Sequence, residues 1–270
     1  MLTHLRNFFP GTVRHSKKTD SILQLTEITG GMLKGRKMLL GQKRAVWQKM
    51  ASGEFEDFIY KPLTENLPST HCTIWDVGGH IGYHTLCFAV LVGERGRVVC
   101  FEPNFFNMEQ IERNLKQNSD LAQRVILDQR ALSDIDGTAE LVQSSNIENT
   151  LSSWSYLDSA TPPNDLVSYK SFKRVKIKTC KGDTLVATGQ IPQPDIIKID
   201  VEGAENLVLL GCQNLLQSAR PLLFIEIHSV LTSISIVQTL CKFGYGIQIL
   251  FAESSPPMRC FILAKPTIQK

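Results

Sequence analysis

Short apolar runs alternate with helical stretches through most of the chain after residue 72. The apolar runs contain few polar positions, which is the pattern of strands covered on both faces of a parallel sheet. A strand, a helix and a further parallel strand are joined by a right-handed crossover. We therefore expect an α/β fold. The expected strands span residues 73–77, 97–101, 124–129, 195–200, 221–228, 246–251 and 259–265, and the expected helices span 83–92, 104–117, 202–210, 215–219 and 233–243.

Two segments interrupt this alternation. Residues 143–173 are mostly polar, and so long a connection in a compact domain is usually a functional loop or a disordered one. Trp154 lies within it and is costly to leave in water, so we expect a lid with Trp154 near the substrate, the alternative being a disordered insertion. Before it, Asp136 and Gly137 form a hairpin signal, and after it residues 175–179 alternate as an edge strand.

The N-terminal part differs from the remainder in charge. Residues 1–50 carry ten Lys or Arg against Asp20 and Glu27, a balance of +8, whereas the other residues carry 19 against 24, a balance of −5, and the two sum to the net +3. Residues 21–50 have helical potential broken by glycines. We interpret residues 1–52 as a basic extension, partly helical or disordered, ahead of a domain over 53–270. The alternative is an arm that meets nucleic acid or a membrane surface, but the basic residues form no dense block.

Composition adds little beyond the class of protein. Hydrophobic residues make up 43% and charged residues 20% of the chain, as in ordinary globular proteins. No apolar run has the length of a transmembrane helix, and the N-terminus has no apolar signal region, so we expect no stable membrane insertion. The seven cysteines are scattered without a C-x-x-C pair, which is typical of a reducing compartment, and we expect a cytoplasmic protein.

The first expected strand ends in a glycine-rich turn. Gly78 and Gly82 let the chain turn sharply into the following helix, whose first N–H groups lack intrahelical partners and point at a ligand. The spacing does not match the G-x-G-x-x-G dinucleotide fingerprint, because His80 stands where the second glycine belongs. It fits D-x-G-x-x-x-G, which begins at Asp76. A carboxylate there repels a pyrophosphate and attracts an ammonium or a sulfonium.

A second carboxylate follows the next expected strand. Glu102 lies twenty residues after Gly82 and can accept both hydroxyls of a ribose. Asp76 and Glu102 together favour S-adenosylmethionine over NAD as the cofactor. The alternative is a glycine turn with only a structural role.

Three stretches resemble the FkbM-type family of S-adenosylmethionine-dependent methyltransferases: residues 76–82, 101–103 and 198–205, the last reading Lys-Ile-Asp-Val-Glu-Gly-Ala-Glu. Residues 131–134 and 224–228 are also similar to that family. The resemblance implies a Rossmann-like class I methyltransferase domain over residues 53–270, with a seven-stranded, mostly parallel sheet whose last strand is antiparallel. It also implies methyl transfer to an oxygen, often of a sugar or polyketide hydroxyl. The residues that it places at the cofactor are Asp76, Gly78, Gly79, His80, Gly82, Glu102, Pro103, Ala131 and Asp200. The family usually has Ala-Asn where this chain has Gly79-His80.

Catalytic candidates follow the fourth and fifth expected strands, because ligands of open α/β sheets bind beyond the carboxyl ends of strands. Aligning the acceptor with the S–CH₃ bond is the main task, and an alcohol also benefits from a general base. We expect His228 to be that base, since its unperturbed pKa suits proton removal near neutrality, with Asp200 and Glu202 assisting. Lys198 and Glu226 are expected to bind substrate.

Each of these residues also has a purely structural interpretation. Glu202 could complement its helix N-terminus, Lys198 and Glu226 could form a buried pair, and His228 could satisfy a loop carbonyl. His80 and His84 are interpreted as neighbours of the cofactor, and no Asp/His spacing in the sequence indicates a metal site.

The reaction expected is methyl transfer from S-adenosylmethionine to a hydroxyl of a small molecule or glycan. The alternatives are N-methylation of a protein or other acceptor, a catalytically silent cofactor-binding subunit and a dehydrogenase. The Asn/Asp-Pro-Pro-aromatic stretch typical of amino-group methylation in nucleic acids is missing, so no nucleic-acid acceptor is expected. The sequence leaves the acceptor and the oligomeric state open.

Overall fold

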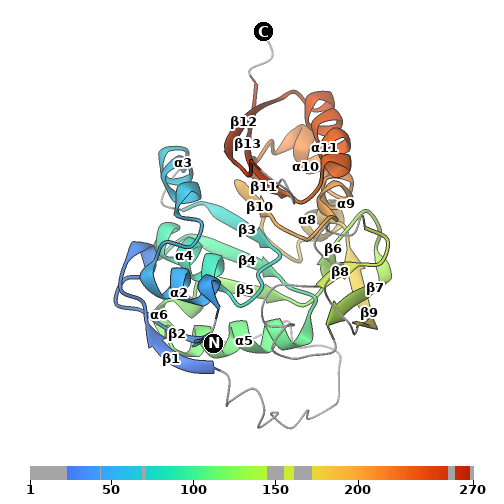
Figure 1. The fold of residues 1–270 in the computed structure, drawn as a ribbon. Coiled ribbons are helices and arrows are strands. Elements are labelled where there is room, and N and C mark those ends of the chain that lie inside the picture. The colour runs from blue at the N-terminus through green and yellow to red at the C-terminus, as the bar shows by residue number, and fades with distance from the viewer. Residues whose placement is uncertain are drawn as a thin grey trace.

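The computed structural model describes residues 23–42, 44–68, 71–144, 155–160, 172–254 and 259–267. Within them a seven-stranded sheet forms the centre of the molecule, in the order β12-β13-β11-β10-β3-β4-β5 (Figure 1). All neighbouring pairs from β11 to β5 are parallel, whereas β13 is antiparallel to both of its neighbours. The expected α/β fold is confirmed, including the antiparallel last strand. The strands are β3 (Thr73–Val77), β4 (Arg97–Phe101), β5 (Val125–Asp128), β10 (Ile196–Ile199), β11 (Leu222–Ile227), β12 (Tyr245–Ala252) and β13 (Cys260–Pro266).

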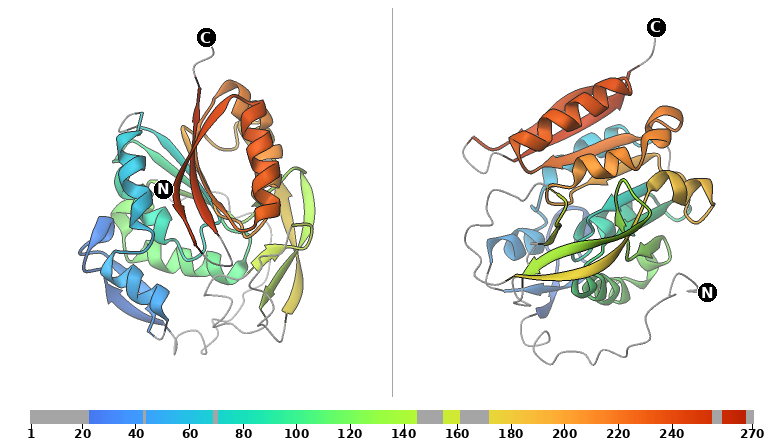
Figure 2. Two further views of the ribbon diagram at one scale, coloured as in Figure 1. Left: turned by 45° about the horizontal axis from the view of Figure 1, so that its top comes forward. Right: turned by 90° about the vertical axis from the view of Figure 1, so that its right-hand side faces the viewer.

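Helices cover both faces of this sheet, and successive residues of each strand supply the two cores in turn. In β3, Ile74 packs with α4 and α5, and Trp75 packs on the opposite face with α8 to α11. Figure 2 shows the two helical layers on either side of the sheet. The layers contain α4 (Tyr83–Leu91), α5 (Phe105–Lys116) and α6 (Ser119–Ala122) on one side, and α8 (Gly182–Ala187), α9 (Glu205–Leu210), α10 (Gln213–Ser218) and α11 (Val230–Lys242) on the other. Among the described residues, no helix is both long enough and apolar enough to cross a membrane.

The helical expectation for residues 21–50 is wrong for most of its length. An antiparallel pair, β1 (Leu23–Glu27) and β2 (Lys37–Gly41), encloses the short turn η1 (Gly31–Leu33), and helix occurs at α2 (Ala45–Ser52), η2 (Asp57–Ile59) and α3 (Tyr60–Glu65). Met38, Leu40 and Trp47 are buried in the same core as α4. Burial against α4 and α5 stabilises the pair, a tertiary contribution that local propensity does not report. The division between residues 52 and 53 stays a prediction.

A second, four-stranded sheet has the order β6-β9-β7-β8 and lies beside the carboxyl ends of the main strands (Figure 1). The hairpin expected at Asp136-Gly137 is wrong, because β6 pairs with β9 and not with β7. Asp136 instead accepts hydrogen bonds from Lys181 N and Thr184 Oγ1. The edge strand expected at residues 175–179 is also wrong, since β9 lies between β6 and β7. The strands are β6 (Ala131–Leu132), β7 (Gly137–Ser144), β8 (Ser155–Leu157) and β9 (Phe172–Cys180).

Gly211 follows α9 as expected for the glycine after a helix, but its φ is −78°, which any residue adopts. A glycine is needed at this position for a steric reason instead, because a Cβ there would overlap the carbonyl oxygen of Ser133. We expect Gly211→Ala to lower the free energy of unfolding by about 1–3 kcal/mol, the scale for overpacking. Gly137→Ala is the matched control, because its Cβ would have only Thr179 Oγ1 within 4.0 Å. Chemical denaturation of both variants measures the difference, and equal stabilities would contradict the steric explanation.

Candidate active site

A cavity lies at the carboxyl ends of β3, β4, β10 and β11, where ligands of open α/β sheets bind. Its wall contains most of the residues expected at the cofactor and four of those expected at the acceptor, Asp200 belonging to both groups. The N-terminal segment and β8 complete the wall through Glu56 and Tyr156. The expected site residues that line it are Gly78, Gly79, His80, Glu102, Pro103, Ala131, Lys198, Asp200, Glu202 and Glu226.

The glycine turn is held between the ends of two neighbouring strands. Gly78 N and Gly79 N both donate to Phe101 O, at 3.0 and 3.1 Å. Gly78 has φ +87°, and a Cβ on it would overlap Asp200 O. A Cβ at Gly79 would overlap Cys100 Sγ. The family's usual alanine at this position therefore does not fit beside Cys100, which accounts for the Gly79 departure in this chain.

Below the turn, Asp76 and Lys198 form a buried ion pair. Asp76 is 0% exposed and accepts a hydrogen bond from Thr85 Oγ1, and its Oδ1 lies 3.5 Å from Lys198 Nζ. Lys198 Nζ also donates to Asp200 Oδ2 at 3.0 Å and Gly78 O at 3.3 Å. Burial opposes the charge on Lys198, but Asp200 and Asp76 outweigh it and raise the pKa of the ammonium. Lys198 thus ties the glycine turn to the end of β10.

These contacts differ from three expectations based on sequence. Asp76 and Gly82 do not line the cavity, because Asp76 is covered by the turn and Gly82 begins α4 with its Cα against Ile111. The suggested pair of Lys198 with Glu226 is replaced by the ion pairs of Lys198 with Asp76 and Asp200. The position of Asp76 beneath the turn therefore gives no support to the expected contact between its carboxylate and the cofactor.

Glu102 stands at the end of β4 with both carboxylate oxygens anchored. Oε2 accepts from His80 N and Oε1 from Asn104 N, each at 2.8 Å. Burial raises the pKa of Glu102 to about 7, although these two hydrogen bonds act in the opposite direction. His80 has φ +50°, a conformation that costs a non-glycine residue about 1–2 kcal/mol. The backbone of His80 is thus bent so that its N–H reaches Glu102, and the Asn107 side chain is a further hydrogen-bond partner of this carboxylate.

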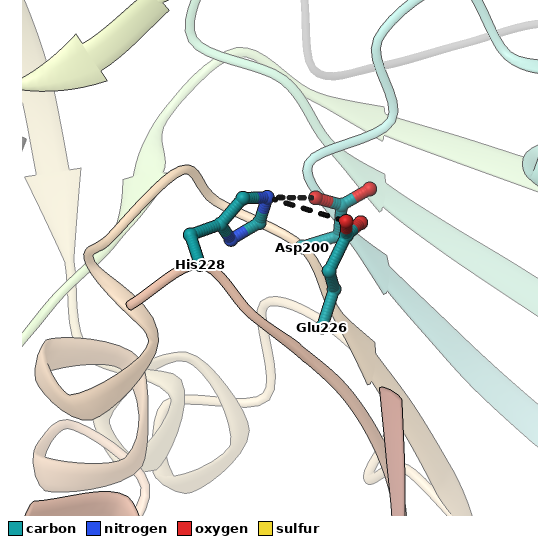
Figure 3. Close-up of side chains that lie close together, drawn as sticks. All are labelled: Asp200, Glu226 and His228. Atoms are coloured by element: carbon teal, nitrogen blue, oxygen red, sulfur yellow. Dashed lines mark ion pairs between the residues drawn. The ribbon is translucent and has the colours of Figure 1, made fainter. Parts of the chain in front are cut away.

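A cluster of acidic side chains surrounds His228 at the ends of β10 and β11 (Figure 3). His228 Nδ1 lies 2.7 Å from Glu205 Oε1. Nε2 faces Glu202 Oε2 at 3.4 Å, Asp200 Oδ1 at 3.5 Å and Glu226 Oε1 at 3.6 Å. The structure therefore brings together the candidates that followed strands four and five of the sequence prediction.

Burial and mutual proximity change the pKa values in this acid cluster. Burial raises the pKa of Glu202 to about 7, and burial together with the Asp200 carboxylate raises that of Glu226 well above its usual range. Burial also acts against ionisation of Asp200, but Lys198 and His228 lower its pKa overall. For His228, burial lowers the pKa, whereas Glu202 and Glu226 outweigh this and raise it well above 6.5.

Sequence reasoning missed Arg259 and Glu56, although it had placed His84 beside the cofactor. Arg259, at the start of β13, lies 3.3 Å from Glu226 Oε1 and 2.7 Å from Glu253 Oε1. On the opposite wall, His84 Nε2 lies 2.9 Å from Glu56 Oε2 and its Nδ1 lies 2.7 Å from Tyr60 Oη. The strongly polar 198–205 stretch was a signal for the acid cluster, but no local pattern links residues 56, 84 and 259.

The remaining expected site residues can be placed only where they belong to the described part of the chain. Trp154 and most of residues 143–173 lie outside the described residues, so the lid stays a prediction. Tyr156 and Ser155, in β8, do line the cavity. Glu202 has φ +53° and does not cap α9; instead Glu205 Oε1 accepts a hydrogen bond from Gly203 N at 2.8 Å.

Comparison with known proteins agrees with this geometry. Residues 76–247 match the methyltransferase FkbM domain. The hexuronic acid methyltransferase AglP of Haloferax volcanii is 34% identical over 156 residues, which are 58% of this chain and 56% of that protein. The chain thus spans about half the length of this curated relative. A crystal structure of methyltransferase FkbM from Methylobacillus flagellatus has a TM-score of 0.52 at 15% identity, covering 74% of this chain and 45% of that one, and so shares the fold. The chain belongs to the FkbM methyltransferase domain family.

Proposed function

We propose that the protein transfers a methyl group from S-adenosylmethionine to a hydroxyl oxygen of a glycan or small molecule, and that the acceptor contains a uronic acid. The single observation that carries this proposal is that Glu102 and the carboxylates of Asp200, Glu202 and Glu226 line one cavity. A cofactor held at Glu102 and an acceptor held at the acid cluster would therefore share that cavity. The family match and the hexuronic acid methyltransferase relative support the reaction class.

The residues present fit S-adenosylmethionine. The backbone of residues 78–80 would surround one part of it, and the carboxylate of Glu102 would accept the ribose hydroxyls. Pro103 and Ala131 provide apolar surface beside Glu102. When bound, the cofactor supplies a methyl group on a sulfonium. The tight anchoring of Glu102 keeps its oxygens in place before the ligand arrives, which lowers the entropic cost of binding.

The acceptor side of the cavity suits a polyol. Asp200, Glu202 and Glu226 lie on one wall, and Glu56 lies on another with its carboxylate oriented by His84. Carboxylates accept hydrogen bonds from hydroxyl groups, whereas they repel a carboxylate. This charge pattern favours a hydroxyl oxygen of the acceptor as the methylated atom. The uronic acid in the acceptor is proposed from the hexuronic acid methyltransferase relative alone, and its carboxylate would have to lie away from this wall.

Within this proposal, Glu202 receives the proton of the acceptor hydroxyl. Its Oε2 is buried and has no hydrogen-bond partner among the described residues, although the side chain lines the cavity. His228 is 3% exposed and does not line the cavity, so its ring lies behind the three carboxylates. We therefore revise the assignment that sequence alone favoured, and give His228 a positioning role through its contacts with those carboxylates.

The proposal is tested by incubating the protein with methyl-labelled S-adenosylmethionine and a panel of glucuronic, galacturonic and neutral oligosaccharides. We expect label in a uronic-acid oligosaccharide, with loss of transfer when S-adenosylhomocysteine is added in excess. Alkali then distinguishes the product, because a methyl ether resists hydrolysis and a methyl ester releases labelled methanol. Binding of S-adenosylhomocysteine without transfer to any acceptor would favour the silent cofactor-binding subunit, and an alkali-labile product would contradict the hydroxyl assignment.

A further inference from the structure

Three side chains of the acid cluster place one potential ligand atom each around a common point. The ligand atoms of Asp200, Glu226 and His228 all lie within 4.8 Å of one another (Figure 3). Each comes from the carboxyl end of β10 or β11, two neighbouring parallel strands. Because residue 200 is distant in sequence from residues 226 and 228, the three form no local metal motif, and their proximity arises from strand pairing.

The two distances from His228 Nε2 within this group match those between ligands of one cation. His228 Nε2 lies 3.5 Å from Asp200 Oδ1 and 3.6 Å from Glu226 Oε1. Nitrogen and oxygen ligands about 2.0–2.2 Å from a tetrahedral ion are about 3.3–3.6 Å from one another. Charge-assisted hydrogen bonds are shorter, at about 2.7–2.9 Å. The spacing of Nε2 from the carboxylates thus fits shared coordination better than direct hydrogen bonding.

The orientation of His228 provides a second, independent observation. The residue is 3% exposed, and Nδ1 lies 2.7 Å from Glu205 Oε1, whose carboxylate is 0% exposed. Metal-binding histidines nearly always donate their other ring N–H to a carboxylate, a backbone carbonyl or water, which fixes the tautomer and aims the free nitrogen at the ion. With Nδ1 used in this way, Nε2 faces the carboxylates of Glu202, Asp200 and Glu226, each at 3.4–3.6 Å.

The excess of carboxylates around His228 also favours a bound cation. Among the described residues of this region, carboxylates outnumber the Lys and Arg groups that contact them, and Asp76, Glu205 and Glu226 are buried. Lys198 is shared between Asp76 and Asp200, and Arg259 between Glu226 and Glu253. Glu202 Oε2 and Glu205 Oε2 are buried without hydrogen-bond partners among the described residues. Uncompensated buried charge is costly, and a divalent cation would offset it.

We propose that Asp200, Glu226 and His228 bind one divalent transition-metal ion, of the Mn²⁺ or Zn²⁺ class. Two carboxylate oxygens and one imidazole nitrogen form a mixed set that suits these ions better than Ca²⁺, which takes six to eight oxygen ligands. Asp200 and Glu226 line the cavity, so the ion would be accessible to an acceptor there. This consequence rests on the proposed function: a hydroxyl coordinated to the ion would lose its proton more readily.

Binding is measured on the full chain after chelator treatment, without cofactor or acceptor. Mn²⁺ is added as the probe and its free fraction is read from its paramagnetic resonance signal, with Zn²⁺ as a competitor. We expect one ion per chain and at least 100-fold weaker binding in Glu226→Gln and His228→Gln. Glu205→Gln retains all three ligands and should weaken binding by about 10–100-fold through loss of the orienting carboxylate. Asp120→Asn, an exposed carboxylate paired with Arg36, is the control and should bind as the wild type does.

Thermal unfolding and S-adenosylhomocysteine binding show that each variant is folded. Failure of the wild-type protein to bind Mn²⁺ or Zn²⁺ would overturn the proposal, leaving a buried histidine among carboxylates. Binding that is unchanged in both Glu226→Gln and His228→Gln would also overturn it, because the ion would then lie elsewhere. Metal binding without methyl transfer would contradict only the proposed function, so the two proposals fail in distinguishable ways.

Discussion

Replacing Glu102 with Ala is expected to weaken the binding of S-adenosylhomocysteine by about 1–3 kcal/mol, or about 5–150-fold, the scale for leaving buried polar groups without partners. The carboxylate accepts hydrogen bonds from both His80 N and Asn104 N, and under our proposal it also accepts the ribose hydroxyls. Calorimetric titration measures the loss. Glu94→Ala removes an exposed carboxylate from the other end of β4 and should leave the affinity unchanged.

The pH dependence of binding gives a second readout of the same group. Burial raises the pKa of Glu102 to about 7, so part of the protein carries a neutral carboxyl near neutrality. A ligand that prefers the ionised form should bind more tightly as pH rises through about 7 and level off above it. Glu102→Gln should remove this dependence. An affinity that is unaffected by Glu102→Ala would place the ribose elsewhere in the cavity.

Glu202→Gln is expected to lower turnover by about 10²–10⁴-fold, the usual range for loss of a general base, with little change in cofactor affinity. The substitution keeps the shape of the side chain but removes the negative charge of a carboxylate whose buried Oε2 has no hydrogen-bond partner among the described residues and lies 3.4 Å from His228 Nε2. Single-turnover assays, run with whichever oligosaccharide of the proposed panel accepts the label, separate this chemical effect from binding. Glu65→Gln, in α3 and exposed, is the matched control.

Two outcomes would contradict the role of Glu202. Near-normal turnover in Glu202→Gln would leave alignment of the acceptor as the whole of the catalysis. A second outcome is turnover that survives Glu202→Gln but is lost in His228→Ala. If the protein is also shown to bind no metal, that result would assign the role of general base to His228, the residue that the sequence alone favoured.

Much of the main sheet was predictable because its strands carry their own signals. The runs at 73–77 and 97–101 coincide with β3 and β4, since buried parallel strands are apolar on both faces. Asn104 caps α5 by accepting hydrogen bonds from Phe106 N and Asn107 N, and asparagine is a favoured residue at this position. The positions of Gly78 and Glu102 at strand ends then followed from topology.

The second sheet and the N-terminal pair were not predictable in the same way. β9 pairs with β6 in parallel and with β7 in antiparallel fashion, and β1 and β2 are stabilised by packing on α4 and α5. These arrangements depend on contacts between residues far apart in sequence. Local propensity and turn signals, such as Asp136-Gly137, do not report them.

By itself, the sequence determined the fold class, the family and the strand ends at which the site would form, because periodicity and short motifs are local properties. Only the tertiary structure decided what each polar side chain does there. It buried Asp76 beneath the turn with Lys198, placed His228 behind Asp200, Glu202 and Glu226, and added Arg259 and Glu56 from distant segments. The reason is physical: charge, burial and coordination depend on distances between atoms of different strands, and strand pairing sets those distances.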